Sequence, residues 1–129
     1  MVSWPRLLVV LPMLLALSAC STRQPLGAQA LSGEEIERLF RGRSFTLVGM
    51  KSGNELVAYA AEEYCSMRYT DGERVSTVRW YTRNDQHCCI KKGEERCGRI
   101  LDMGNGVYHK IIDGEHTQTM QRFEAGNRL

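Results

Sequence analysis

The sequence predicts a mainly β domain, an antiparallel eight-stranded meander that closes into a small barrel, with one short N-terminal α-helix. Short β-prone runs recur roughly every ten residues over residues 45–123, and turn residues separate them. Several of these separators are Asn-Gly or Asp-Gly pairs, which favour two-residue hairpin turns because both turn positions need a positive φ. Closure into a barrel is expected because it removes the unpaired edges of the meander.

The helix is predicted over residues 33–41. Ser32 and Glu35 have the spacing of a capping box, in which each residue satisfies a backbone N–H at the helix start. Gly42 is expected to end the helix. Three apolar residues recur at helical spacing and would form the buried face of the helix: Ile36, Leu39 and Phe40.

The eight strands are predicted in chain order over residues 45–50, 56–61, 64–70, 75–82, 87–91, 96–103, 107–112 and 116–123. Apolar residues that we expect to fill the interior alternate with neighbours of the opposite face along two strands: Val78 and Trp80 with Arg79 and Tyr81, and Val107 and Ile111 with Tyr108 and Lys110. A barrel of this size is either filled by its own side chains or holds one small ligand. A ligand cavity would be expected near Trp80.

The first 19 residues have the order of a bacterial lipoprotein signal peptide. Arg6 supplies the positive charge, residues 7–16 are apolar, and Leu17-Ser18-Ala19-Cys20 resembles the motif at which lipoproteins are cut and lipidated. The apolar run is shorter than the roughly 20 residues that a membrane-spanning helix needs. We expect cleavage before Cys20 and attachment of lipid to it, so that the membrane is one partner of the chain. The alternative is an ordinary cleaved signal with a cysteine nearby.

Residues 20–30 are predicted to be a flexible tether because they carry Pro25, Gly27 and small or polar residues without periodicity. The barrel domain would then occupy residues 31–129. Ser21 follows the lipidated cysteine, and in Gram-negative lipoproteins a residue other than Asp there is typical of sorting to the outer membrane. An outer-membrane anchor facing the periplasm is therefore expected, with the inner membrane as the alternative.

The number and distribution of charged residues argue against nucleic-acid binding. The chain has 17 Lys and Arg against 15 Asp and Glu, and its charges are interspersed. A nucleic-acid binder usually carries a clustered basic surface. We therefore expect no nucleic-acid partner.

Four cysteines remain beyond Cys20, and export favours disulfides between them: Cys65, Cys88, Cys89 and Cys97. A two-residue turn at Lys92-Gly93 places Cys88 opposite Cys97 in a non-hydrogen-bonded pair, about 4.5 Å apart at Cα. That separation is near the lower end of the range of about 4.4–6.8 Å that is usual for disulfides. A three-residue loop would instead place Cys89 opposite Cys97. With the first pairing, Cys65–Cys89 follows by elimination.

A zinc or copper site is the competing interpretation, with these four cysteines and His87 as ligands. Structural zinc sites usually space their paired cysteines by two to four residues, whereas Cys88 and Cys89 are adjacent. A catalytic His87–Cys88 pair is also unfavourable because neighbours on a strand point to opposite faces. The sequence therefore predicts no catalytic residue, no metal and no cofactor.

The order of several features also matches a known group of proteins. They are a helix opening like Leu31–Ile36, a glycine that closes it, Trp80 in mid-chain, Cys88 or Cys89 with Cys97, Gly106-Val107-Tyr108, and an end like Phe123–Asn127. In these features the chain resembles small exported bacterial lipoproteins of unknown function. The resemblance implies a calycin-like β-barrel and implies no activity.

The lipoprotein inhibitors of bacterial lysozyme are similar in size, anchoring and barrel class. Their inhibitory loop reads Ser-Gly-x-x-Tyr, but here Ser52-Gly53 is followed by Leu56 where the tyrosine should be. We therefore expect a non-enzymatic binding or envelope-supporting module, with a protein partner or a small apolar ligand. The alternatives are an inhibitor of a lysozyme-like hydrolase that uses the loop Lys51–Asn54, and a small-ligand carrier.

Overall fold

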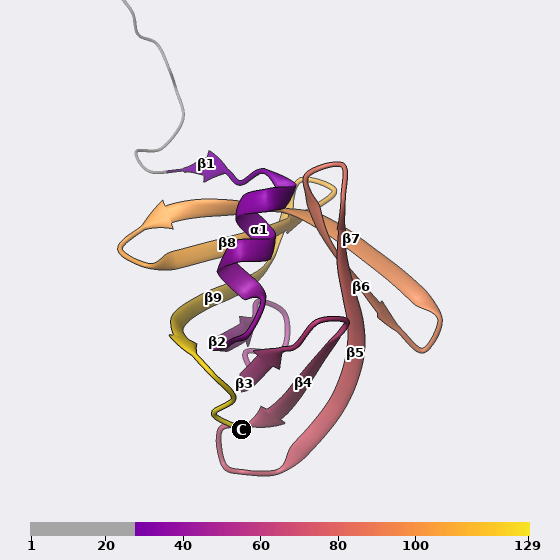
Figure 1. Cartoon of the computed structure of the whole chain (residues 1–129), viewed down its shortest axis with the longest axis vertical. Coiled ribbons are helices and arrows are strands. Elements are labelled where there is room, and N and C mark those ends of the chain that lie inside the picture. The colour runs from indigo at the N-terminus through magenta and orange to yellow at the C-terminus, as the bar shows by residue number, and fades with distance from the viewer. Residues whose placement is uncertain (1–27) are drawn as a thin grey trace, which may run out of the picture.

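A computed structural model describes residues 28–129 and shows a closed antiparallel β-barrel of eight strands with one short helix (Figure 1). The predicted fold class is confirmed. The predicted signal peptide, Cys20 and most of the predicted tether lie outside the described residues. The elements are β1 (Gln29–Ala30), α1 (Gly33–Phe40), β2 (Arg43–Gly49), β3 (Glu55–Ala60), β4 (Tyr64–Tyr69), β5 (Arg74–Arg83), β6 (Gln86–Lys91), β7 (Glu94–Gly104), β8 (Val107–Ile112) and β9 (Glu115–Ala125).

Each strand from β2 to β9 pairs with the next strand in the chain, and β2 pairs with β9 to close the barrel. Strand β1 is an addition to the predicted set. It pairs with β7 through Gln29 opposite Asp102 and Ala30 opposite Leu101. The last residues of the predicted tether are therefore held by backbone pairing, and the folded part begins before residue 31.

Two-residue turns join four of the hairpins. Both central residues of each turn have a positive φ: Asn84-Asp85, Lys92-Gly93, Asn105-Gly106 and Asp113-Gly114. That backbone conformation is the one that the sequence pattern predicts, because its twist matches that of the flanking strands. Short turns of this kind also set the register of each hairpin.

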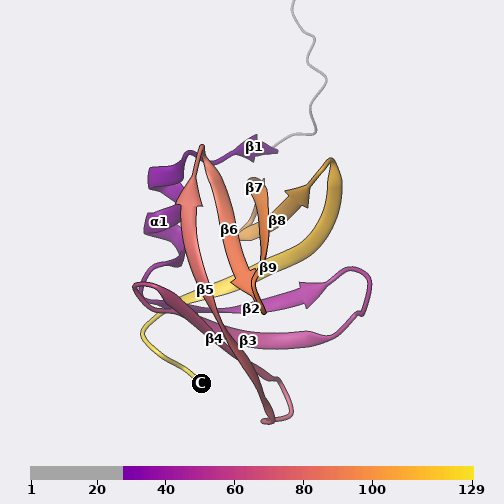
Figure 2. The ribbon, with the colours of Figure 1, turned by 90° about the vertical axis from the view of Figure 1, so that its right-hand side faces the viewer.

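Helix α1 covers one end of the barrel, beside the ends of β5 and β6 (Figure 2). Its start has the predicted capping box between Ser32 and Glu35. The backbone N–H of Gly33 donates to Asp85 Oδ1 at 2.7 Å, and Thr82 Oγ1 donates to Glu37 Oε2 at 2.9 Å. These contacts fix the helix on the turn between β5 and β6. Within residues 28–129, no helix is long and apolar enough to cross a membrane.

Candidate ligand-binding cavity

The barrel encloses a cavity of about 450 Å³. Phe40 of α1 and Phe45 of β2 line its closed end, and its walls are mostly apolar. The cavity extends to the opposite end of the barrel, where residues of the connecting turns and strand ends surround it: Met50, Lys51, Ser52, Lys91, Arg96 and Glu115. We call this end the mouth. Small-molecule sites in proteins are typically concave, largely apolar and about 300–1,000 Å³ in volume.

The closed end is filled by an aromatic cluster. Phe40 packs edge-to-face against Phe45, with ring centroids 5.1 Å apart, and lies 4.6 Å from the ring of His87. Trp80 is only 2% exposed, stacks on His87 and donates from Nε1 to the carbonyl oxygen of Ala61 at 2.8 Å. Trp80 does not itself line the cavity. It therefore acts as core, and the cavity lies on the mouth side of the side chains that cover it.

A polar group interrupts the apolar wall. Lys110 of β8 is 2% exposed, and its Nζ lies 3.0 Å from His87 Nδ1 of β6. Cys89 Sγ lies 3.9 Å from the same Nζ and 3.8 Å from His87 Nδ1. Because an ammonium has no acceptor, Lys110 donates and His87 Nδ1 accepts, which leaves the imidazole proton on Nε2. All three side chains line the cavity.

Burial controls the ionisation of these groups. It holds the pKa of His87 well below its usual range, and the positive charge of Lys110 acts in the same direction. The pKa of Lys110 is also lowered, mainly by burial. Burial raises the pKa of the Cys89 thiol, and raises that of Cys65 to about 12. His87, Cys65 and Cys89 are therefore neutral near pH 7.

Lys110 faces the interior, contrary to the alternation that the sequence suggested for β8. Tyr108 packs edge-to-face on Phe123 of the core, and Ile112 lines the cavity, so the face that carries Lys110 is the inner one. Val107 and Ile111 are only partly buried. The strand has apolar residues on both of its faces, so its periodicity does not determine which face is buried. The sequence feature that could have indicated this inward-facing residue is a lysine among apolar residues on a strand of a small barrel.

The predicted Cys65–Cys89 disulfide is wrong, because both residues are free cysteines. Cys65 of β4 faces Val78 of β5, and Cys89 of β6 faces Trp80 of β5, so β5 lies between them. Two strand spacings amount to roughly 9–10 Å. A disulfide needs a Cα separation below about 7 Å.

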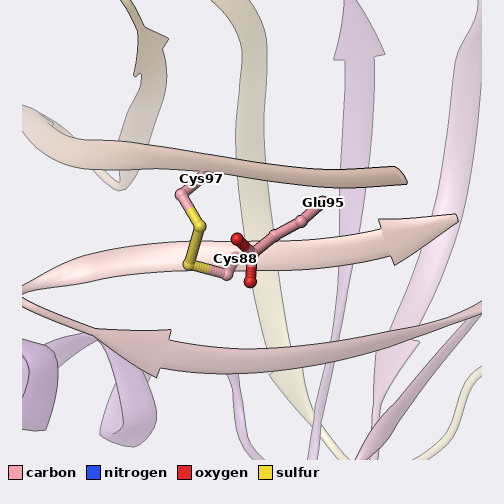
Figure 3. A group of neighbouring side chains, drawn as sticks. All are labelled: Cys88, Glu95 and Cys97. Atoms are coloured by element: carbon pink, nitrogen blue, oxygen red, sulfur yellow. A yellow bond between two sulfur atoms is a disulfide. The ribbon is translucent and has the colours of Figure 1, made fainter. Parts of the chain in front are cut away.

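Cys88 and Cys97 form a disulfide, as the register at the Lys92-Gly93 turn predicted, with their Cα atoms 4.0 Å apart (Figure 3). Glu95 lies beside them, and ligand-type atoms of the three residues fall within 4.8 Å of one another. Both sulfurs are used in the disulfide, so they offer no thiolate to a metal. Glu95 instead pairs with Arg83 at 2.9 Å.

The cysteines and histidine that the metal interpretation combined are divided between the two faces of the barrel wall. His87 and Cys89 line the cavity together with Cys65, whereas Cys88 lies between His87 and Cys89 on β6 and points the other way, toward Cys97. A single metal ion therefore cannot contact all four cysteines and His87.

The loop Lys51–Asn54 forms the turn between β2 and β3. The N–H of Gly53 donates to the carbonyl oxygen of Gly49 at 2.8 Å, and the N–H of Asn54 donates to Ser52 Oγ at 3.1 Å. Lys51 and Ser52 line the mouth.

Comparisons of the chain with known protein families, curated proteins and solved structures find no match.

Proposed function

We propose that the domain binds a small, largely apolar molecule inside its barrel, and that it does so as a carrier or binding module without catalysing a reaction. The observation that carries this proposal is the cavity of about 450 Å³, closed by α1 at one end and bordered by exposed residues at the other. The apolar part of its wall comes from several strands and includes Leu47, Leu56, Met67, Val78 and Met120. Burial of apolar ligand surface against such a wall contributes about 25 cal/mol per Å².

The aromatic cluster at the closed end supports the same proposal. Ile36 and Phe40 of α1 are fully buried, so the apolar face of the helix is already packed against the core. The half of the barrel nearer the mouth is not filled by side chains and contains the cavity. Protein interiors otherwise pack to the density of organic crystals and hold few voids larger than a water molecule.

A neutral probe tests this proposal. Phenylnaphthylamine, which fluoresces strongly in apolar surroundings, is expected to bind to the purified domain. Met67→Trp would place a large side chain in the cavity, and we expect it to weaken binding by about tenfold or more. The matched control is Met103→Trp, because Met103 does not line the cavity. Absence of probe binding, or equal binding by the two variants, would contradict the proposal.

We further propose that the domain is held at the outer membrane, on its periplasmic side, by lipid on Cys20, and that it belongs with the small exported lipoproteins it resembles. The motif Leu17–Cys20 supports the anchor. One acyl chain binds a membrane only marginally, whereas several chains give a stable anchor.

Labelling of cells with a radioactive fatty acid tests the anchor. The wild-type protein is expected to carry the label and to sediment with the outer membrane, whereas Cys20→Ala is expected to carry none. Cys65→Ala is the control, because Cys65 is buried in the barrel. A labelled Cys20→Ala protein, or wild-type protein in the inner-membrane fraction, would contradict this part of the proposal.

A further inference from the structure

We propose that the ligand is an amphipathic monocarboxylate, whose carboxylate pairs with the Lys110 ammonium inside the barrel while its apolar chain lies along the cavity toward the mouth. This inference rests on the proposed function, since it names the chemical class of the molecule that occupies the cavity.

Lys110 is buried without a counter-charge among the described residues. Within residues 28–129, no carboxylate oxygen lies within 4.0 Å of its Nζ. Its hydrogen-bond partners are the neutral His87 ring and the Cys89 sulfur. A buried ammonium is costly unless it is paired and hydrogen-bonded. A bound carboxylate would supply the missing negative charge.

Lys110 lies between the two ends of the cavity. Its Nζ contacts His87, which packs on Phe40 at the closed end, while Ile112 of the same strand lies toward the mouth. A head group at Lys110 therefore leaves the apolar wall on the mouth side for a hydrocarbon chain. A single buried cation matches a head group with a single negative charge.

The mouth of the cavity carries an excess of positive charge. Three cationic side chains, Lys51, Lys91 and Arg96, line this end of the cavity together with one carboxylate, Glu115. Clefts lined by one sign of charge raise the local concentration and the association rate of oppositely charged ligands. The mouth therefore favours entry of an anion over that of a cation.

A further polar atom lines the cavity. Among the described residues, the hydroxyl of Ser76 is a buried side-chain group without a hydrogen-bond partner, and Ser76 lines the cavity. Buried polar groups in native proteins are nearly always hydrogen-bonded. A bound molecule with an oxygen atom would satisfy this hydroxyl.

The test compares three ligands of equal chain length: dodecanoate, dodecanol and dodecylamine. Their affinities are measured by displacement of phenylnaphthylamine, below their micellar concentrations. We expect wild-type protein to prefer dodecanoate, then dodecanol, then dodecylamine. Lys110→Met should weaken dodecanoate binding by about 30-fold or more, because truncation of one partner of a buried charge pair costs about 2 kcal/mol or more. Dodecanol binding should not weaken.

Two further variants complete the design. Lys110→Gln removes the charge but keeps a hydrogen-bonding group, and it is expected to behave like Lys110→Met. Lys91→Met is the matched control, because Lys91 lies on the same inner face of β6 as His87 but is exposed at the mouth. It should change dodecanoate affinity only a few-fold, and less so at higher salt.

The outcomes separate the two proposals. If dodecanol binds as well as dodecanoate, or if the Lys110 variants keep the affinity for dodecanoate, the carboxylate inference is wrong and the cavity remains a site for neutral ligands. If none of the three ligands binds and phenylnaphthylamine does not bind either, the proposed function itself fails. The ligand preference of the wild-type protein is informative even if a Lys110 variant does not fold.

Discussion

Replacement of Gly98 by alanine is expected to destabilise the barrel by about 3 kcal/mol, the upper end of the range typical of overpacking. A Cβ atom at this position would lie 2.5 Å from the carbonyl oxygen of Ile111 and 2.8 Å from Ile112 Cγ1. The first of these contacts is with backbone, which does not move aside as a flexible side chain does. Strands β7 and β8 would have to separate at the place where β7 passes from pairing with β6 to pairing with β8.

Urea unfolding followed by tryptophan fluorescence measures this effect through Trp80. Gly33→Ala is the matched control, since its added Cβ would meet nothing closer than Asp85 Oδ1 at 3.4 Å, an ordinary van der Waals distance. The control should change the free energy of unfolding by no more than about 0.5 kcal/mol. If the two variants lose the same free energy of unfolding, the close approach of β7 and β8 is not what excludes a side chain at residue 98.

Acidification is expected to destabilise the protein through His87. In the unfolded chain this histidine takes up a proton near pH 6.5, whereas in the folded chain burial and the charge of Lys110 keep its pKa well below that value. Below pH 6.5 the unfolded state therefore binds more protons than the folded state, and stability falls as the pH falls. The slope for one such group approaches about 1.4 kcal/mol per pH unit.

The measurement is urea unfolding at several pH values between 7 and 5, for the wild-type protein and His87→Gln. The glutamine keeps an acceptor for Lys110 but does not titrate, so most of the pH slope over this range should vanish. His109→Gln is the comparison, and it should remove less of the slope than His87→Gln, because His109 is less buried than His87. His109 is partly buried and stacks on His116, and burial lowers its pKa. A His87→Gln protein with the wild-type slope would rule out His87 as the source.

Local sequence signals predicted most of the secondary structure. The helix start at Ser32, the eight barrel strands and the two-residue turns such as Lys92-Gly93 all depend on neighbours a few residues apart in the chain. The Cys88–Cys97 pairing belongs to the same class, because a tight turn sets the register of the hairpin around it.

The interior site depends on contacts between distant parts of the chain and was not predicted. Lys110 and His87 are 23 residues apart, and they meet because β6 and β8 both pair with β7 and both side chains lie on the inner surface. The predicted Cys65–Cys89 disulfide failed for a related reason. Counting cysteines identifies possible partners but does not show that β5 lies between them.

The hairpins, the helix and the expectation of export follow from the order of amino acids, because turn chemistry, capping and the signal motif at Leu17–Cys20 act over a few neighbouring residues. Which face of β8 points inward, and whether side chains fill the barrel, depends on how the strands pack in three dimensions. The pairing of β6 and β8 with β7 brings Lys110, His87 and Cys89 to one cavity, and no local pattern records that proximity. The physical reason is that the buried face of a strand with apolar residues on both sides is set by the strands that pair with it.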